Sequence, residues 1–439
     1  MTSHLQPAQT APTDEAAAPP CPHFGPCGGC QLQHLTYQAQ LAGKAERLRG
    51  LLGATLADPP ALQLHASPPL GYRNRIRLTL AQVEGRLRAG YLRAADAAPR
   101  PAPEDAFDFG PDEPPANSAP AHTSMGKLSF LPITECPIAA PVLWRTAEAF
   151  LALASEPLGA WLHDRHIPDQ LELFTNADES RLNLTLSLRT TSRTLPEQIV
   201  AAFAAFCEQL RTQVPALSGA GISLLPLASR KRSRRAEAPR PGATWSAAGL
   251  HYIVANPLDL ATPLGYWVPR TAFFQVNRFL IPELVALATE QAAAAPKKSL
   301  AWDLYAGAGL FSRPLARLFD AVTAVEIAEA AHTALAGIKL PNLHAVRSTT
   351  LDFLRAAVLQ RERPDLVLLD PPRTGAGAEV CALLGRLAAP TLIYVSCSPE
   401  HLAPDLGILA AAGYKVDALH LFDLFPQTTH TETVAILTR

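Results

Sequence analysis

Short, uninterrupted apolar runs recur in the last third of this 439-residue chain, separated by segments of helical character. The clearest runs span residues 300–304, 321–325, 366–369 and 392–395. A strand that helices cover on both faces is apolar along its whole length, so these runs predict a parallel sheet. We therefore expect residues 246–439 to form a doubly wound, Rossmann-like α/β domain.

The first half of the chain follows different periods. Residues 37–52 carry apolar side chains at helical spacing and predict an amphipathic helix. Residues 72–80 and 86–93 alternate between polar and apolar positions, which predicts a β-hairpin. Residues 141–228 mix two helical and two alternating segments. We therefore expect residues 21–245 to form an α+β region.

Three segments lack the periodicity of helices or strands. Residues 1–20 are rich in Ala, Pro and Thr and are expected to be a disordered tail. Residues 94–123 form a tract rich in Pro, Ala and acidic residues, which predicts a surface insertion. Residues 229–242 contain a run of Arg and Lys followed by prolines, and this basic loop is expected to be solvated.

Charge gives little direction at the level of the whole chain. Charged residues make up 18% and the formal net charge is -1, which argues neither for nor against a nucleic-acid partner. Local patches are more informative, because Arg73, Arg75 and Arg77 place three positive charges on one strand face. These charges suit RNA phosphates, although a solvated strand face explains each arginine almost as well.

Compartment and assembly follow from what the sequence lacks. No apolar run reaches membrane-spanning length, and no secretory signal opens the chain. The seven cysteines are odd in number and unevenly spread, unlike a disulfide framework. We expect a cytoplasmic protein without a membrane partner, whose thiols stay available for metals and catalysis. Nothing in the sequence indicates an oligomer, so a monomer is expected.

Two cysteine patterns at opposite ends of the chain suggest chemistry. Cys21, Cys27 and Cys30 share one short segment, which is typical of a cradle for a metal or a cluster. Cys397 follows an apolar strand, and a thiol at the end of a buried strand suits a nucleophile. A buried, inert thiol is the commoner fate of a free cysteine, and Cys381 fits that alternative better.

A second group of residues indicates a nucleoside ligand. Gly307 and Gly309 lie between a predicted strand and a predicted helix, where glycines permit a tight turn and the close approach of a ligand. Glu326 ends the next strand, where a ribose-binding acid belongs in such a fold. Asp370 closes the strand 366–369 at the same edge of the sheet, and the prolines after it stiffen its turn.

Taken in order, these residues resemble the S-adenosylmethionine-dependent RNA uracil-C5 methyltransferases, and among them the iron–sulfur members that act on 23S ribosomal RNA. The Asp-Pro-Pro-Arg and Ser-Cys-Ser-Pro motifs are the most specific part of the resemblance. The matching motifs are Cys21-x5-Cys27-x2-Cys30, Tyr72-Arg-Asn-Arg75, Phe274-Gln-Val-Asn277, Asp303-x-Tyr-x-Gly-x-Gly309, Asp370-Pro-Pro-Arg373, Ser396-Cys-Ser-Pro399 and Thr431-Glu-Thr433.

The resemblance implies the transfer of a methyl group from S-adenosylmethionine to C5 of a uridine in RNA. It favours 23S ribosomal RNA as the substrate, with transfer RNA as the second choice. It implies that Cys397 is the nucleophile that adds to C6 of the base and that Glu432 is the general base. The residues expected to line the pocket for the methyl donor and the target base are Gln275, Tyr305, Glu326 and Asp370.

The resemblance also implies a [4Fe–4S] cluster held by four thiolates. The expected ligands are Cys21, Cys27, Cys30 and Cys136. Four thiolates also suit a structural zinc ion, but zinc ribbons favour two Cys-x2-Cys knuckles and this chain has one. The cluster is therefore the favoured assignment, as an element for folding and RNA positioning.

Two positions depart from the family pattern, and two rival functions share parts of it. Leu310 stands where members of the family often carry Asn, and Thr349 stands where they place a polar or acidic residue near the adenine of the methyl donor.

An RNA cytosine-C5 methyltransferase uses the same thiol addition, but it usually carries a cysteine where this chain has Arg373. A cluster-bearing RNA-binding protein without catalysis is the rival from another class.

Overall fold

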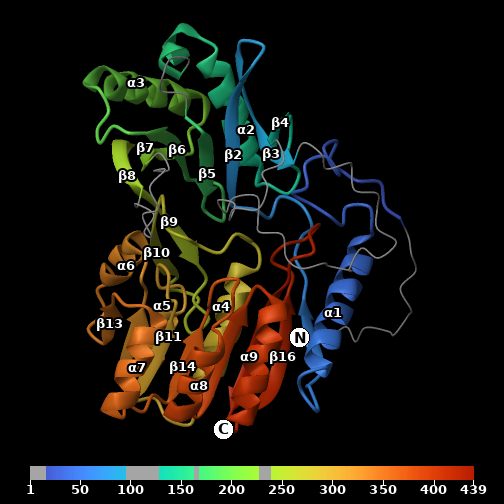
Figure 1. Ribbon diagram of the computed structural model, residues 1–439. Coiled ribbons are helices and arrows are strands. Elements are labelled where there is room, and N and C mark those ends of the chain that lie inside the picture. Colours follow the sequence, from blue (N-terminus) through green and yellow to red (C-terminus); the bar gives the residue numbers. More distant parts are fainter. Residues whose placement is uncertain (1–15, 95–127, 163–167, 227–238) are drawn as a thin grey trace.

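The computed structural model describes residues 16–94, 128–162, 168–226 and 239–439. These residues form two layered α/β bodies, one above the other in Figure 1, with a two-stranded hairpin between them. Most of the predicted insertion and the basic run of the predicted loop lie outside the described residues. So does most of the predicted tail, but Ala17 N donates a hydrogen bond to His34 O at 2.8 Å.

The upper body is built on a seven-stranded sheet with the order β4-β3-β2-β5-β6-β7-β8. Its strands are β2 (Arg75–Val83), β3 (Arg86–Ala94), β4 (Leu128–Pro132), β5 (Gln170–Thr175), β6 (Leu182–Thr190), β7 (Leu217–Pro226) and β8 (Arg240–Ser246). Its helices are α2 (Pro141–Ala154), the 3-10 helix η1 (Pro157–Leu162) and α3 (Glu197–Gln213). The three helices contact one another over a common apolar core, so the helices and strands expected here from the sequence are present.

The arginines of β2 support the fold of this body. Arg77 donates from Nε to Glu172 Oε2 on the neighbouring strand β5 at 2.9 Å. Arg75, whose side chain is 14% exposed, lies 3.6 Å from the other oxygen of Glu172. It also donates to Ala272 O at 2.8 Å and lies over the Phe174 ring. Because Glu172 pairs with both arginines, Arg75 and Arg77 support the fold of this sheet, while a single carboxylate offsets only one of their two positive charges. The expectation that these arginines bind phosphates stays a prediction.

The lower body is built on an eight-stranded sheet with the order β1-β16-β17-β15-β14-β11-β12-β13. Its strands are β1 (Leu62–His65), β11 (Leu300–Leu304), β12 (Ala321–Val325), β13 (Leu343–Val346), β14 (Leu366–Leu369), β15 (Thr391–Ser396), β16 (Lys415–Phe422) and β17 (Glu432–Thr438). Strands β11 to β15 are parallel, and β17 runs antiparallel to both of its neighbours. The parallel sheet expected from the apolar runs is thus confirmed.

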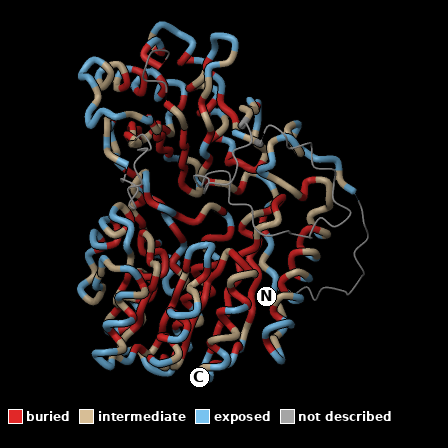
Figure 2. Tube along the Cα trace, in the orientation of Figure 1, coloured by how far each residue is buried: buried red, intermediate tan, exposed pale blue. Residues whose placement is uncertain are grey.

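Helices lie in front of and behind this sheet, and its central strands β14, β15 and β17 are almost wholly buried (Figure 2). The helices are α1 (Tyr37–Gly53), α4 (Ile281–Ala293), α5 (Ser312–Leu318), α6 (Glu329–Ala336), α7 (Thr350–Gln360), α8 (Ala378–Leu387) and α9 (Pro399–Ala411). Strand β11 pairs with β12 on one side and with β14 on the other, so the strand order reverses there. In such sheets ligands bind beyond the carboxyl ends of the strands at the reversal.

Residues 37–65 belong to the lower body, although they precede the whole upper body in the chain. Strand β1 pairs in parallel with β16, and α1 packs against α9 (Figure 1). The apolar side of α1, with Leu48 and Leu52, joins the core of the lower sheet. The predicted 21–245 region is therefore not one unit, because its first helix and strand pack on the C-terminal sheet.

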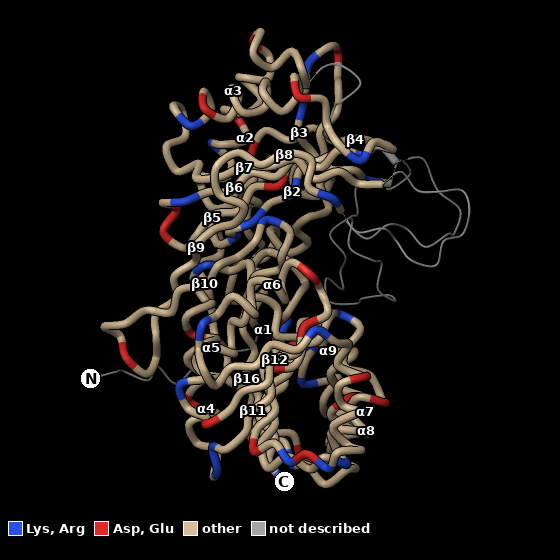
Figure 3. Tube along the Cα trace, turned by 90° about the vertical axis from the view of Figure 1, so that its left-hand side faces the viewer, with Lys and Arg blue, Asp and Glu red and all other residues tan. Residues whose placement is uncertain are grey.

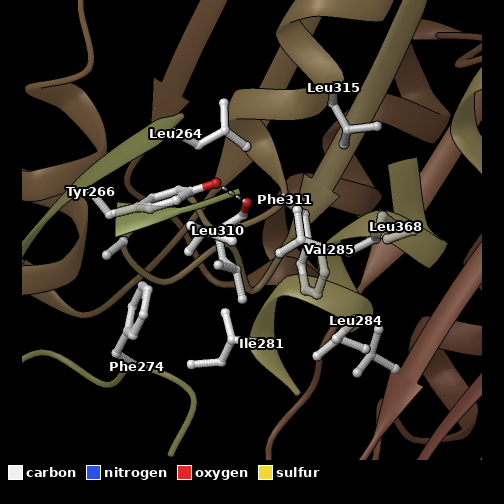
Figure 4. Close-up of a cluster of buried hydrophobic side chains, with 14 of the residues drawn as sticks. Leu264, Tyr266, Phe274, Ile281, Leu284, Val285, Leu310, Phe311, Leu315 and Leu368 are labelled. Atoms are coloured by element: carbon white, nitrogen blue, oxygen red, sulfur yellow. Dashed lines mark hydrogen bonds between the residues drawn. The ribbon is translucent and has the colours of Figure 1, made fainter. Parts of the chain in front are cut away.

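The hairpin between the bodies consists of β9 (Gly249–Val254) and β10 (Leu264–Pro269). Its inner face enters an apolar cluster with α4 and the segment after β11 (Figure 4). In this cluster the Tyr266 hydroxyl donates to Leu310 O at 2.9 Å. Among the described residues, no helix is both long and apolar enough to cross a bilayer.

Candidate active site

Three polar side chains converge where β14, β15 and β17 meet. Asp370 follows β14, Cys397 follows β15, and Glu432 opens β17. Strands β14 and β15 are neighbours, and β15 is in turn paired with β17 through Ser396 and Thr433. The charges of Glu432 and Asp370 both raise the pKa of the Cys397 thiol, as expected for groups that share one site.

The Cys397 thiol is protonated in the free protein. Burial is the main reason that its pKa rises to about 12, and the charges of Glu432 and Asp370 add to the rise. The Arg373 guanidinium acts in the opposite direction. In the described part of the chain, Arg373 is exposed and has no ion pair or hydrogen bond. Arg373 is therefore the group that favours the thiolate form of Cys397.

Glu432 is 2% exposed at the floor of the site. Burial raises its pKa well above the usual range, Asp370 raises it further, and Arg373 lowers it. Its Oε1 atom has no hydrogen-bond partner among the described residues. A buried carboxyl group without a partner is costly, and such groups gather at functional sites.

Asp370 and Gln275 form a polar pair beside Cys397. Gln275, on the loop after β10, donates from Nε2 to Asp370 Oδ2 at 3.2 Å. The backbone of Gln275 is itself held in place, because Asn74 Nδ2 donates to the backbone carbonyl oxygen of Gln275 at 2.9 Å. Burial raises the pKa of Asp370 to about 7 and the bond from Gln275 opposes the rise. The pair presents an amide and a carboxyl group, which together match the donors and acceptors of a base edge.

A fourth acid, Asp303 on β11, was not assigned a role from the sequence. It is fully buried and bonded to the Ser312 hydroxyl at the start of α5, while its Oδ1 has no partner among the described residues. Burial raises its pKa to about 7, opposed by the bond from Ser312, and the charges of Asp370 and Glu326 raise it further. The available signal was an acid inside an otherwise apolar strand directly before a glycine turn.

The glycine turn after β11 is fastened by Glu326. Its carboxylate accepts a hydrogen bond from Gly307 N at 2.9 Å and another from Ala328 N at 2.6 Å. Tyr305 begins the turn with φ of 61°, a left-handed conformation that is rare for a side chain of this size. At Gly309 a Cβ atom would lie 2.7 Å from the Ile338 side chain, so the turn requires glycine there. Tyr305, Glu326 and Asp370 thus follow β11, β12 and β14, at the carboxyl ends of the strands where the strand order reverses.

The two departures from the family pattern have structural explanations. The Leu310 side chain is 7% exposed and is part of the apolar cluster below the glycine turn (Figure 4). Thr349 caps α7, because its hydroxyl accepts from Asp352 N at 3.0 Å and bonds the Asp352 carboxylate at 2.7 Å. Both residues fit their surroundings, so neither indicates a site that has decayed.

The four expected cluster ligands lie on two segments that are tied together. His23 Nε2 accepts from Thr134 N at 2.9 Å, which joins the first cysteine segment to the segment that carries Cys136. Burial raises the pKa of Cys30 to about 12 and that of Cys136 to about 11. The charge of Cys136 also raises the pKa of Cys30, and the charges of Cys27 and Cys21 raise that of Cys136. Among the described residues, however, no group of three or more His, Cys, Asp or Glu is arranged to hold a metal ion.

Basic and acidic residues are interspersed over both bodies in the view of Figure 3.

Comparison with known proteins gives consistent results. Residues 255–439 match the family model described as tRNA (Uracil-5-)-methyltransferase. A 23S rRNA (uracil(1939)-C(5))-methyltransferase, RlmD, of Pseudomonas putida is 31% identical, and the match covers 98% of this chain and 81% of that protein. The protein of the same description from Halomonas elongata is 29% identical, with 96% of this chain and 76% of that protein covered.

The fold has a counterpart among solved structures. The tRNA (uracil-54, C5)-methyltransferase of Pyrococcus abyssi, solved in complex with S-adenosyl-L-homocysteine, superposes with a TM-score of 0.62 at 21% identity. The match covers 94% of this chain and 86% of that one, so both bodies and their connection share its fold.

Proposed function

This chain belongs to the family of S-adenosylmethionine-dependent RNA uracil-C5 methyltransferases, and from that premise we propose that it methylates a uridine of 23S ribosomal RNA with Cys397 as its nucleophile. The observation that carries the assignment of residues is the convergence of Cys397, Glu432 and Asp370 at adjoining strand ends. Relatives that act on 23S ribosomal RNA match nearly the whole chain, which favours that substrate over transfer RNA.

The target base has to leave its helix before it enters this site. Asp370 and Gln275 lie in a crevice at the strand ends, which a base stacked inside a duplex does not reach. A uridine in a loop is therefore the expected substrate, since it is unstacked at little cost. We assign the Asp370–Gln275 pair to the edge of the uracil ring, where its carboxyl and amide groups fix the orientation of the base.

Cys397 begins the reaction by forming a bond between its sulfur and C6 of the ring. The thiol first gives its proton to solvent water, the thiolate adds to C6, and the electrons of the C5–C6 double bond move toward O4, which makes C5 nucleophilic. Arg373 favours the step because its charge lowers the pKa of the thiol. S-adenosylmethionine, as the methyl donor, supplies a methyl carbon bound to a sulfonium, and C5 takes that carbon while the sulfur keeps the bonding pair.

Glu432 completes the reaction by removing the proton from C5. The electrons of the C5–H bond then restore the C5–C6 double bond, and the C6–S bond breaks to return the thiolate of Cys397. A carboxylate in a buried setting is a stronger base than one in water, once it is ionised. The raised pKa of Glu432 therefore suits this role. For the methyl donor, we assign Tyr305 and Glu326 to the crevice beside the glycine turn.

We assign Cys21, Cys27, Cys30 and Cys136 to a [4Fe–4S] cluster. Four thiols on two tied segments supply the donor set that such clusters use, and burial raises the pKa of all four. When bound, the cluster would supply a covalent link between the two segments. The residues of the reaction itself lie elsewhere, so no step of methyl transfer needs an electron from it.

The test of the function is methyl transfer followed by nucleoside mass spectrometry. Protein purified without oxygen is given S-adenosylmethionine and either unmodified 23S ribosomal RNA or transfer RNA. We expect 5-methyluridine in the ribosomal RNA. Cys397→Ala should lower the rate by at least about 10⁴-fold, because the covalent route is closed.

The matched control is Cys381→Ala, which removes a fully buried thiol from the core of the lower body. This variant should keep methyl transfer while losing some stability. Transfer to transfer RNA alone would reassign the substrate, and 5-methylcytidine would move the protein to the rival class of cytosine enzymes. Equal activity of Cys397→Ala and the parent protein would exclude Cys397 as the nucleophile.

The test of the cluster is metal analysis of the same anaerobic protein. We expect about four iron and four sulfide per chain, with the visible absorption of an iron–sulfur cluster, and little zinc. Cys30→Ser and Cys136→Ser should each lower the iron content, whereas Cys207→Ser should not. About one zinc per chain without sulfide would assign the site to structural zinc instead.

A further inference from the structure

The turn that carries Glu432 is held by segments from far away in the chain. Residues 423–431 connect β16 to β17 and end directly at Glu432. Asn277 Nδ2 donates to Leu424 O at 3.1 Å, and the Tyr72 hydroxyl donates to Pro426 O at 3.0 Å. Asp423 N donates to His65 O of β1 at 2.9 Å, and further bonds come from α1 and the residues before it. Together these hydrogen bonds from distant segments hold the turn more firmly than a simple connection between two strands requires.

Lys44 of α1 forms a buried ion pair at the start of this turn. Its Nζ donates to Asp423 Oδ1 at 2.7 Å and to Phe425 O at 3.0 Å. The Lys44 side chain is 1% exposed and that of Asp423 is fully buried. Removing two charges from water is costly, and such a pair is a poor way to gain stability alone. It does fix geometry, because each charge has to stay beside the other.

Gln40, one turn earlier on α1, holds the middle of the same turn. Gln40 and Gln427 form a reciprocal pair: Gln427 N donates to Gln40 Oε1 at 2.9 Å, and Gln40 Nε2 donates to Gln427 Oε1 at 3.0 Å. Gln427 has φ of 68°, a left-handed conformation that is unfavourable for a glutamine. The amides of Gln31 and Leu32 both donate to its carbonyl oxygen at 3.0 Å. Such a strained residue persists only where its surroundings hold it.

The strong fastening has a physical reason at the other end of the turn. Glu432 lies beside Asp370 and Cys397. Burial raises the pKa of Glu432 and that of Cys397, and the charge of Asp370 raises both further. Repulsion of this kind tends to push the acid out toward water. We propose that Lys44 and Gln40 are positioning residues that hold Glu432 at C5 of the base. This inference rests on the proposed role of Glu432 as the general base.

The position of Glu432 matters at one step only. Bond formation between Cys397 and C6, and the transfer of the methyl group, come before the C5 proton is removed. With Glu432 displaced, those steps still proceed, but the C6–S bond does not break. The methylated RNA then stays covalently attached to Cys397. A defect in α1 that merely loosened the fold would instead slow all steps together.

The experiment measures attached and released RNA in a single turnover with the full-length, metal-loaded protein. The variants are Lys44→Met and Gln40→Leu, compared by denaturing gel and by nucleoside mass spectrometry. We expect the ratio of attached to released methylated RNA to rise about tenfold or more in each. The double variant Lys44→Met/Asp423→Asn leaves no buried charge without a partner, so it tests the same point in a protein with a milder folding defect.

Two controls separate the possible failures. Leu48→Ala truncates a buried residue of α1 that lies one turn beyond Lys44 and packs into the core of the lower sheet, so it should lower the melting temperature without trapping RNA. Glu432→Gln should trap RNA most strongly. Release of RNA by Glu432→Gln at the parent rate would overturn the base assignment itself.

The positioning role alone would be overturned if Glu432→Gln traps RNA and the α1 variants do not. It would equally be overturned if attachment and release fell together in the α1 variants, in proportion to the loss of melting temperature, as in Leu48→Ala.

Discussion

The two sheets of this protein differ in how their charged side chains are paired. In the upper sheet, Glu172 lies between Arg75 and Arg77, so the buried carboxylate has a cation on each side. In the lower sheet, the charge of Asp370 acts on both Asp303 and Glu432, and the described residues place no buried cation between these acids. The first arrangement stabilises a fold and the second destabilises one. A protein keeps the second where chemistry needs it, which identifies the lower strand ends as the working part of the molecule.

The largest expected effect concerns the pH dependence of stability. The pKa of Asp303 is about 7 in the folded protein and near its ordinary value when unfolded, so the folded state binds the extra proton between about pH 4 and pH 7. The free energy of unfolding should therefore fall as pH rises through this window. The contribution of Asp303 is at most about 4 kcal/mol, from about 1.4 kcal/mol per unit of pKa.

Asp303→Asn should flatten this decline, as measured by urea unfolding at pH 5 and pH 8. Part of the decline should remain, because Asp370 also has a pKa of about 7. The exposed Asp320→Asn serves as the control and should follow the parent protein. If the free energy of unfolding fell as steeply between pH 5 and pH 8 in Asp303→Asn as in the parent protein, ionised Asp303 would not destabilise the fold.

The second effect concerns the ion pairs that Glu172 forms with Arg75 and Arg77 in the upper sheet. Glu172→Gln leaves the mostly buried Arg75 without its carboxylate, which should lower the free energy of unfolding by about 3 kcal/mol. The catalytic constants per folded molecule should stay the same. Glu329→Gln breaks an exposed pair with Arg347 and should change stability by less than about 1 kcal/mol. A loss of methyl transfer without a loss of stability in Glu172→Gln would instead place this cluster in RNA binding.

The smallest effect distinguishes two arginines. Arg373 lowers the pKa of Cys397, so Arg373→Ala should slow single-turnover methyl transfer roughly tenfold near neutral pH. The defect should shrink at higher pH, where the thiolate forms without help. Arg77→Ala, in the upper sheet, should leave the rate and its pH profile unchanged. A defect of Arg373→Ala that is equal at every pH would point to contact with the RNA and not to the thiol.

Much of the lower body could be predicted from the sequence, because its central strands are apolar over their full length. Strand β16 escaped prediction because polar residues such as Lys415, Asp417 and His420 interrupt its pattern. The pairing of β1 with β16 was also missed, since no local pattern tells a strand which distant partner it will join. The boundary between the two regions was misplaced for the same reason.

For the site, sequence motifs named residues but not their surroundings. Strand ends that share one edge of the sheet predict that Cys397 and Asp370 lie close together, whereas Glu432 is expected there from the family resemblance. The charges of Asp370 and Glu432 both act on Cys397, and the catalytic roles stay predictions. The pairing of Arg75 with Glu172 was not predictable, because the two residues lie almost a hundred positions apart on strands that only the fold brings together. The metal ligands, the monomeric state and the cytoplasmic location stay predictions.

The position of β1 at the edge of the lower sheet, paired with β16, has a consequence for how the protein folds during synthesis. Residues 62–65 leave the ribosome long before their partner strand β16 is made, because the whole upper body lies between the two strands in the chain. The segment next to Cys30 likewise waits for Gln427, on which it docks. A chain that terminates early therefore keeps the apolar sides of α1 and β1 without cover. Such a product should be a ready client for chaperones and proteases, whatever the state of its upper body.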